Sequence, residues 1–189
     1  MKKALLTIAI SVAGILTYAQ TWTLDKAHAK LKFTVTHLMV SDVDGLFKSF
    51  DVKITSSKDD FTDAVIELTA DINSINTEND YRDNDLKSEK FFDAAKFPTL
   101  SFKSTSIQKI DAKYYKLSGN LTMHGITKPI VLDAILNGTV VSPMSKKTVA
   151  GFKIKGLVNR TDFGIAPTFP TAVVSDEVAI TANIEIDKN

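Results

Sequence analysis

Three histidines are the residues of this sequence best suited to bind a metal or to exchange a proton near neutral pH. They are His28, His37 and His124, and no HxH or HxxxH spacing joins any two of them. The chain contains no Cys that could join them as a ligand. Histidines this far apart form a metal site only if the fold brings distant strands together. We therefore expect no metal site. We expect instead hydrogen-bonded histidines at strand ends, where they could also contact the polar part of a ligand.

The sequence carries no recognisable catalytic motif. A GxSxG elbow, a P-loop, a GxGxxG turn and an HExxH helix are all absent. Asp162-Phe163-Gly164 matches a kinase tripeptide, but neither a glycine-rich loop nor a catalytic loop accompanies it. An enzyme needs convergent titratable groups in a cleft, and the sequence does not display them. We expect a non-enzymatic protein without a cofactor, and an enzyme acting on a small molecule is the alternative.

Arginine is scarce, and this makes Arg82 and Arg160 candidates for contacting a ligand. They are the two arginines among 23 basic residues, the others being lysines. A guanidinium group suits bidentate binding of phosphate or carbonyl oxygens. The alternative for Arg82 is a solvated helix face, because residues 78–90 are rich in both acidic and basic side chains. We take Arg82, Arg160 and His37 as candidate contacts for a polar head group.

The first nineteen residues have the pattern of a signal peptide. Lys2 and Lys3 precede an apolar run from Ala4 to Leu16, and Ala19 closes a tolerable cleavage site. The run is shorter than the roughly 20 residues that span a membrane. We therefore expect residues 1–19 to be removed and residues 20–189 to form a single domain. The chain has no Cys and therefore no disulfide to stabilise it. This fits export to a bacterial periplasm better than a harsher extracellular setting, so the periplasm is the expected location, with secretion as the alternative.

The overall charge argues against a nucleic-acid partner. Without Lys2 and Lys3 the basic count is 23 − 2 = 21 against 22 acidic residues, a net charge of −1. Nucleic-acid binding would require a basic patch.

Most of the chain alternates apolar and polar residues with a period of two, as half-buried strands do. In 114–124 the apolar set contains Tyr115, Leu117, Leu121 and Met123. Similar runs are 29–36, 47–55, 63–72, 99–107, 128–141, 148–158 and 176–187, and 41–45 is expected to be a turn-rich loop. About eight strands at hairpin spacing predict an all-β protein, an antiparallel barrel or a sandwich.

A helical insertion interrupts this alternation near residues 79–97. Asn79 is a suitable helix cap, and Pro98 ends the segment. Phe91 and Phe92 are too much apolar area for a solvated loop, so we expect them to cover part of the barrel as a lid.

Eleven Phe and four Met predict a soft apolar interior. By itself this composition favours an ordinary filled core over a tunnel. An eight-stranded barrel is wide enough either to be filled by side chains or to hold one slender ligand. The candidate tunnel residues are Phe33, Val35, Leu38, Met39, Phe47, Phe91, Phe92, Leu100, Phe102, Leu117, Leu121 and Met123.

Several motifs, in order, are similar to those of a known family. They are WTLDKAHAKLKFTVTHLMV, GLFKSFDVKI, Arg82-Asp83 followed by Leu86, FFDAAKFPTLSFKSTS, GNLTMHGITKPIVLDAIL and NRTDFGI. Together they cover essentially residues 21–188 and resemble the YceI family of small bacterial lipid-binding proteins. The resemblance implies a lipocalin-like antiparallel barrel around an apolar tunnel for a polyisoprenoid or quinone tail. Two positions depart from the family pattern: Asp85 stands where a His is common, and Ala29 where a Ser often follows His28.

The resemblance turns the preference from a filled core to a tunnel. We expect a protein that binds, and in doing so transports or stores, an isoprenoid lipid such as a polyprenyl phosphate or a quinone. A filled barrel acting as a stress-response interaction module is a further alternative. A transient membrane contact and a homodimer are both compatible with lipid binding.

Overall fold

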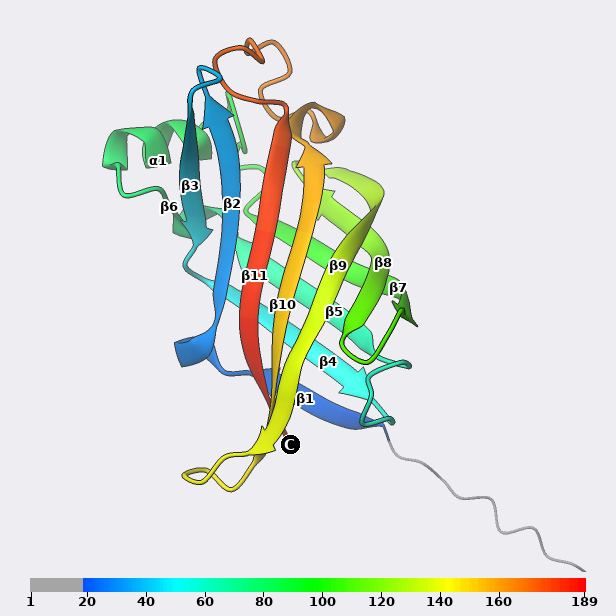
Figure 1. Ribbon diagram of the computed structural model, residues 1–189. Coiled ribbons are helices and arrows are strands. Elements are labelled where there is room, and N and C mark those ends of the chain that lie inside the picture. The colour runs from blue at the N-terminus through cyan, green and yellow to red at the C-terminus, as the bar shows by residue number, and fades with distance from the viewer. Residues whose placement is uncertain (1–18) are drawn as a thin grey trace, which may run out of the picture.

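The strands close into an antiparallel barrel. The computed structural model describes residues 19–189. Eight strands form a ring in the order β1–β4–β5–β7–β8–β9–β10–β11, and β1 pairs with β11 to close it (Figure 1). This confirms the predicted fold class. The elements are β1 (Gln20–Leu24), η1 (Lys26–His28), β2 (Lys30–His37), β3 (Ser41–Phe47), β4 (Phe50–Ser56), β5 (Val65–Asp71), η2 (Ile72–Ser74), β6 (Ile75–Asn76), α1 (Asp80–Lys87), β7 (Thr99–Lys109), β8 (Tyr114–Met123), β9 (Ile126–Val141), β10 (Thr148–Asn159), η3 (Arg160–Phe163) and β11 (Glu177–Lys188).

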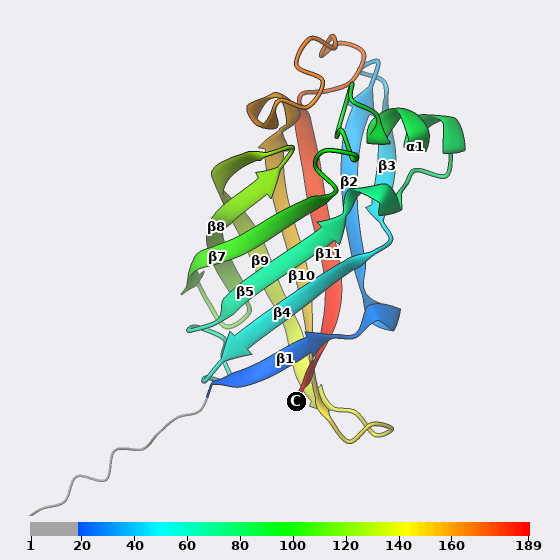
Figure 2. The same cartoon turned by 180° about the vertical axis from the view of Figure 1, so that it is seen from behind.

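The barrel extends upward on one side beyond the closed ring. β11 pairs with β1 through residues 186–188 and with β2 through residues 179–183. β2 then pairs with β3, which makes a short pair with β6. Figures 1 and 2 show β2, β3 and α1 standing at the upper end, while β1 and β4 lie at the lower end. The two ends of the barrel are therefore built differently.

The predictions for residues 41–55 were wrong in detail. The expected loop is the strand β3, because the chain already reverses at Leu38 and Met39, whose φ angles are 51° and 58°. The expected single strand is broken at residues 48–49, between β3 and β4. This break shifts the alternation by one residue. Phe47 consequently faces the interior together with Val52, whereas an unbroken strand would place them on opposite faces.

Elsewhere the interior follows the predicted alternation. In β8 the buried side chains are Tyr115, Leu117, Leu121 and Met123. Glycines make room for large interior side chains on neighbouring strands. Cβ atoms built at Gly45, Gly119 and Gly156 would overlap Phe33, Phe102 and Leu132 respectively.

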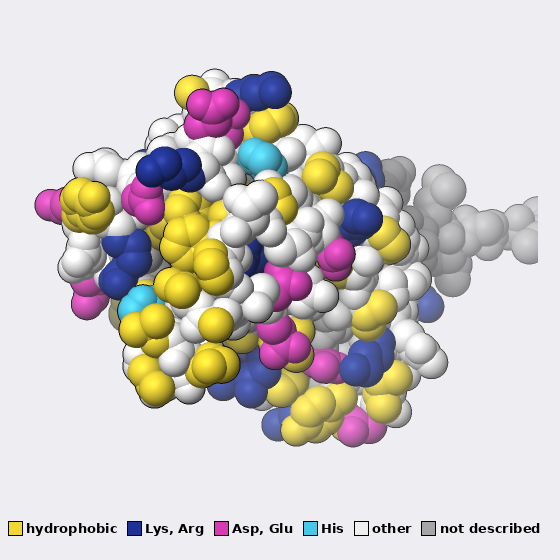
Figure 3. Space-filling view, turned by 90° about the horizontal axis from the view of Figure 1, so that it is seen from above, with side chains coloured by type: hydrophobic (Ala, Val, Ile, Leu, Met, Phe, Trp, Pro, Cys, Tyr) yellow, Lys and Arg dark blue, Asp and Glu magenta, His cyan; other side chains and the backbone are white. Residues whose placement is uncertain are grey.

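The helical insertion covers the upper end. Helix α1 begins after Asn79, whose side chain accepts a hydrogen bond of 3.0 Å from the backbone N–H of Arg82. The helix is anchored by the buried carboxylate of Asp83, which accepts hydrogen bonds from the Thr77 N–H and hydroxyl at 2.8 and 2.6 Å. Phe91 and Phe92 follow α1 and pack on the core. Figure 3 looks down on this end and shows hydrophobic side chains gathered there between charged ones.

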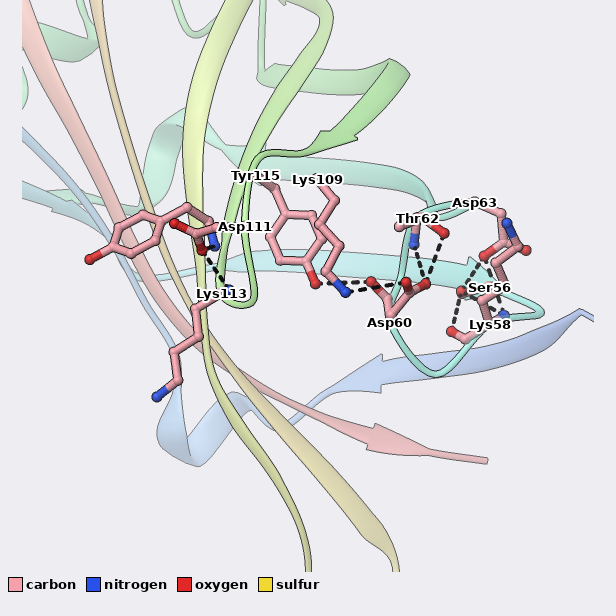
Figure 4. Close-up of polar contacts among 10 residues, drawn as sticks. Ser56, Lys58, Asp60, Thr62, Asp63, Lys109, Asp111, Lys113 and Tyr115 are labelled. Atoms are coloured by element: carbon pink, nitrogen blue, oxygen red, sulfur yellow. Dashed lines mark hydrogen bonds and ion pairs between the residues drawn. The ribbon is translucent and has the colours of Figure 1, made fainter.

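A loop plugs the lower end. Phe61, in the connection from β4 to β5, is 1% exposed, and its ring centroid lies 5.0 Å from that of Trp22 and 5.1 Å from that of Phe152. The Tyr115 hydroxyl donates to the Asp60 carbonyl oxygen at 3.0 Å (Figure 4). The Asp63 carboxylate holds the same loop, as Figure 4 also shows, through contacts that include the Ser56 hydroxyl at 2.6 Å. The barrel interior is therefore closed from below.

Within residues 19–189, every helix is too short or too polar to cross a bilayer.

Candidate ligand-binding cavity

An apolar cavity of about 380 Å³ occupies the barrel interior. Side chains from nearly every strand line it, and most of them are aliphatic or aromatic. Its volume lies near the lower limit of the roughly 300–1,000 Å³ typical of small-molecule sites. Because Phe61 and Trp22 pack below it, the cavity is reached from the upper end, where polar side chains join the lining.

Ten of the twelve predicted tunnel residues line this cavity. They are Phe33, Val35, Phe47, Phe91, Phe92, Leu100, Phe102, Leu117, Leu121 and Met123. The lining also contains residues absent from the sequence-based set, among them Val52, Ile54, Ile66, Leu68, Phe152, Ile154, Phe169 and Ile184. The strand alternation could have identified Ile66, Leu68 and Ile184, because they share a face with other apolar residues. Phe169 lies in a loop, where no periodicity marks it.

Leu38 and Met39 do not line the cavity, and their assignment to the tunnel needs correction. Both occupy the tight turn between β2 and β3 with left-handed backbone angles, and both side chains are exposed. Residues at the tip of a hairpin lie beyond the last strand pair, so an interior face no longer exists for them. Apolar character alone did not distinguish a hairpin tip from a tunnel wall.

Aromatic rings form a chain across the upper half of the cavity. The Phe33 and Phe47 centroids are 5.5 Å apart, and Phe92 meets Phe47 edge-on at 6.3 Å. Phe91, on the same lid, lies 5.7 Å from Phe169 of the loop between η3 and β11. The predicted lid is thus in aromatic contact with two other elements that frame the cavity entrance.

Arg82 lines the cavity with part of its guanidinium group free. Its Nε donates to the Thr77 hydroxyl and its Nη2 to the Thr77 carbonyl oxygen, both at 2.8 Å. Within residues 19–189, nothing accepts a hydrogen bond from its Nη1. Asp85 and His37 also line the cavity, and the His37 ring makes no hydrogen bond to another described residue. Lys32, Thr77 and Arg160 are the other polar residues of the lining, which is otherwise apolar.

Arg160 lies at the same end, but all its hydrogen-bond donors are taken up by the backbone. It is 4% exposed, and its guanidinium group donates to five backbone carbonyl oxygens. Nε reaches Ser175 at 3.2 Å, Nη1 reaches Ile165 at 3.1 Å and Ala166, and Nη2 reaches Phe169 at 2.8 Å and Val174 at 3.3 Å. These are all the donors an arginine has. Arg160 therefore holds the loop at the cavity entrance in place. It has no donor left for a head group, so the predicted contact between Arg160 and a head group needs correction.

The other two histidines are hydrogen-bonded outside the cavity. The Nδ1 atom of His124 lies 3.1 Å from the Phe163 carbonyl oxygen, and that of His28 lies 2.8 Å from Asp25 Oδ2. The hydrogen bond with Asp25 raises the pKa of His28 and lowers the pKa of Asp25. Ligand atoms of Asp25, His28 and Glu185 lie within 4.8 Å of one another at the exposed lower end. We assign no metal to this surface cluster, because exposed His–carboxylate pairs form without one.

The remaining lowered carboxyl pKa values belong to surface contacts rather than to the cavity. Hydrogen bonds from Thr34 and Lys32 lower the pKa of Asp44, and those from Thr62 lower that of Asp60. Lys103 lowers the pKa of Glu67. For Asp63, burial raises the pKa, but four hydrogen bonds from residues 56–58 outweigh it and lower the pKa strongly. None of these four carboxyl groups lines the cavity.

The family of the chain follows from comparison with known proteins. A model of the YceI-like domain matches residues 22–186. The chain belongs to the YceI-like domain family.

Relatives of this YceI-like protein agree with the match. A UPF0312 protein of Staphylococcus aureus is 39% identical over 144 residues, covering 76% of this chain and 81% of the relative. The crystal structure of a Campylobacter jejuni YceI protein superposes with a TM-score of 0.72 at 29% identity, covering 100% of this chain and 99% of that one.

A polyisoprenoid binding domain from Saccharophagus degradans has the same fold. It superposes with a TM-score of 0.64 at 16% identity, covering 89% of this chain and 98% of that one. The family resemblance inferred from the sequence motifs is confirmed by the domain match over residues 22–186.

Proposed function

We propose that this YceI-like protein binds an isoprenoid lipid, such as a polyprenyl phosphate or a quinone, with its tail in the barrel cavity and without chemical conversion. The observation that carries the proposal is an apolar cavity that is plugged below by Phe61 and Trp22 and has Arg82, Asp85 and His37 in its lining. The family match and the polyisoprenoid binding domain of S. degradans support it. We further propose that the protein acts after export, in the periplasm or outside the cell.

Affinity would come mainly from the tail. Removing apolar surface from water is worth about 25 cal/mol per Å², so each isoprene unit that enters the cavity adds to binding. A few polar groups then orient the head. Because the cavity measures about 380 Å³, affinity should rise with tail length until the cavity is full and then level off. Mass spectrometry of organic extracts from natively purified protein would identify the bound lipid.

A cavity-filling variant tests the site. Ala182 of β11 is buried and lines the cavity, whereas the neighbouring Ala179 is not part of the lining. Ala182→Phe should abolish the uptake of prenyl or quinone analogues by delipidated protein, and Ala179→Phe should leave it intact. Denaturant melts of both variants report whether each still folds. Wild-type protein that takes up no polyprenyl or quinone analogue would refute the proposal.

The alternatives receive less support. A filled barrel does not fit an interior cavity of this size. An enzyme would need a nucleophile or a general base in hydrogen-bonded pairing. Within residues 19–189 the candidate base in the cavity lining, His37, has no such side-chain partner.

A further inference from the structure

Two neighbouring segments at the cavity entrance expose apolar side chains and carry no acidic residue, lysine or arginine. One is the β2–β3 hairpin tip, residues 37–41, with the sequence HLMVS; the other is residues 166–175 of the loop before β11, with the sequence APTFPTAVVS. Leu38, Met39, Val40 and Phe169 are 51%, 76%, 81% and 38% exposed. We call these two segments the apolar rim.

The apolar rim is one continuous and fixed surface. The N–H of Leu38 donates to the Val173 carbonyl oxygen at 2.9 Å, and His37 forms a β-bridge with Val174. The loop is held from beneath by the five hydrogen bonds of Arg160. Its exposed apolar side chains are therefore presented by a defined backbone.

The same surface borders one side of the cavity entrance, opposite the lid that follows α1. His37, Phe169, Val173 and Val174 line the cavity, while their neighbours in the two segments point into solvent. Figure 1 shows the hairpin and the loop together at the upper end. A partner seated on the apolar rim would thus cover the opening through which a ligand passes.

The turn residues do not follow from the requirements of the turn. Leu38 and Met39 have φ angles of 51° and 58°, a left-handed conformation that favours Gly, Asn or Asp. Large apolar residues at these positions add backbone strain and exposed apolar area. Backbone strain clusters at functional sites, and here it coincides with exposed apolar side chains beside the cavity entrance.

We propose that the apolar rim docks on the surface of a lipid bilayer. The occupant is inferred from the chemistry of the surface. It offers apolar side chains without an acidic residue, lysine or arginine for pairing, and it opens into a cavity for apolar matter. Docking by shallow insertion would let a tail move between bilayer and cavity without crossing water, and this consequence rests on the proposed function. Because insertion depends on apolar area, binding should need no anionic lipid and should persist at high salt.

Co-flotation with phosphatidylcholine vesicles tests the docking. The rim variant is Met39→Asn with Val40→Ser, in which Asn suits the left-handed turn. The matched control is Met144→Asn with Val141→Ser, in the exposed β9–β10 hairpin at the opposite end, where Met144 is 92% exposed. All proteins carry the N-terminus found in the purified wild type. The wild type and the control should float with the vesicles, and the rim variant should lose at least about tenfold in partitioning.

Four results would overturn the proposal. They are no flotation of the wild type, equal flotation of the rim variant, binding that appears only with added phosphatidylglycerol and disappears in salt, and an equal loss in the control. A dimer seen by sedimentation that the rim variant dissolves would assign the surface to a second copy of the chain and would also overturn it.

Ligand binding in vesicle-free solution separates this proposal from the proposed function. The rim variant should take up a short-chain prenyl analogue like the wild type, because its substitutions lie outside the cavity. Flotation without uptake of any analogue would leave the docking standing and refute the lipid-binding function. Uptake of an analogue without flotation would refute the docking and leave the lipid-binding function standing.

Discussion

Arg82 and Arg160 show how similar residues acquire different roles from their surroundings. All the donors of Arg160 are hydrogen-bonded to backbone carbonyl oxygens, so a buried cation is stabilised by peptide dipoles within a loop. Only part of the donors of Arg82 are hydrogen-bonded, to Thr77. A ligand oxygen at the cavity entrance can therefore engage Arg82 without breaking an existing contact.

Arg82→Ala should weaken binding of a phosphate- or carbonyl-bearing prenyl ligand more than binding of a bare hydrocarbon of the same length. A hydrogen bond to a charged group is worth about 1.5–3 kcal/mol, so a loss of roughly tenfold or more is expected for the polar ligand. Titration of delipidated protein with both ligands measures it. An equal loss for both would show that Arg82 only holds α1 to Thr77.

Asp63 makes the lower plug sensitive to acid. Its folded-state pKa lies below the ordinary value of 3.8. Its contacts therefore stabilise the fold above that pH and are lost as the pH falls through the folded-state value. Asp63→Asn should cost about 1 kcal/mol at neutral pH, a modest figure because the carboxylate is exposed to solvent.

Urea melts at neutral pH and at about pH 3 check this prediction, and the difference between Asp63→Asn and wild type should be smaller in acid. Asp59→Asn is the control, because the Asp59 side chain is 96% exposed and pairs only with Lys188 at 3.6 Å. A difference that grows in acid would contradict the assignment.

At the scale of elements, strand β8 shows the clearest division between interior and exterior. Leu121 is buried and lines the cavity, while the hydroxyl of the next residue, Thr122, lies 2.8 Å from that of Thr127 at the exposed surface. Period-two alternation required this division, and the structure confirms it.

Leu121→Arg should therefore destabilise the protein by several kcal/mol, because an unpaired cation would enter the apolar interior. Thr122→Arg should stay within about 0.5 kcal/mol of wild type, since its head remains in water. Denaturant melts and prenyl-analogue binding of both variants provide the readouts. Damage from Thr122→Arg with a silent Leu121→Arg would mean that the strand faces are inverted.

Glycines on neighbouring strands fix the positions of cavity-lining rings. A Cβ at Gly119 would overlap the Phe102 ring and come within 2.6 Å of the Lys103 carbonyl oxygen. Gly119→Ala should therefore cost about 1–3 kcal/mol and displace Phe102 in the cavity. Gly138→Ala, on β9 with nothing near its Cβ, should be close to neutral. Thermal melts that rank the two variants in the opposite order would rule out this explanation.

At the scale of the whole molecule, the predicted removal of residues 1–19 sets the first residue of the mature chain. The signal peptide falls almost wholly outside the described residues 19–189 and stays a prediction, while β1 begins at Gln20. The intact mass of protein from the periplasm or medium should correspond to a chain starting at Gln20, because Ala19 closes the apolar leader. A product that starts at Met1 and sediments with membranes would show an uncleaved anchor.

The sequence alone determined most of the strands, most of their inward faces and the family. Alternation of apolar residues is a local property, because neighbours along a strand must face opposite sides. It therefore identified part of the cavity lining on three strands, namely Phe33 and Val35 of β2, Leu100 and Phe102 of β7, and Leu117, Leu121 and Met123 of β8. Composition alone favoured a filled core, and the motif resemblance changed this expectation to a tunnel.

Only the tertiary structure decided the features that depend on where the chain turns and what it meets there. The break at residues 48–49 set the face of Phe47, and the turn at residues 38–39 moved two apolar residues from the expected tunnel to the rim. Five carbonyl oxygens of the loop that follows η3 gave Arg160 its role. The alternation of apolar residues does not mark these features, because turn positions and the directions of backbone carbonyl groups depend on the path of the folded chain.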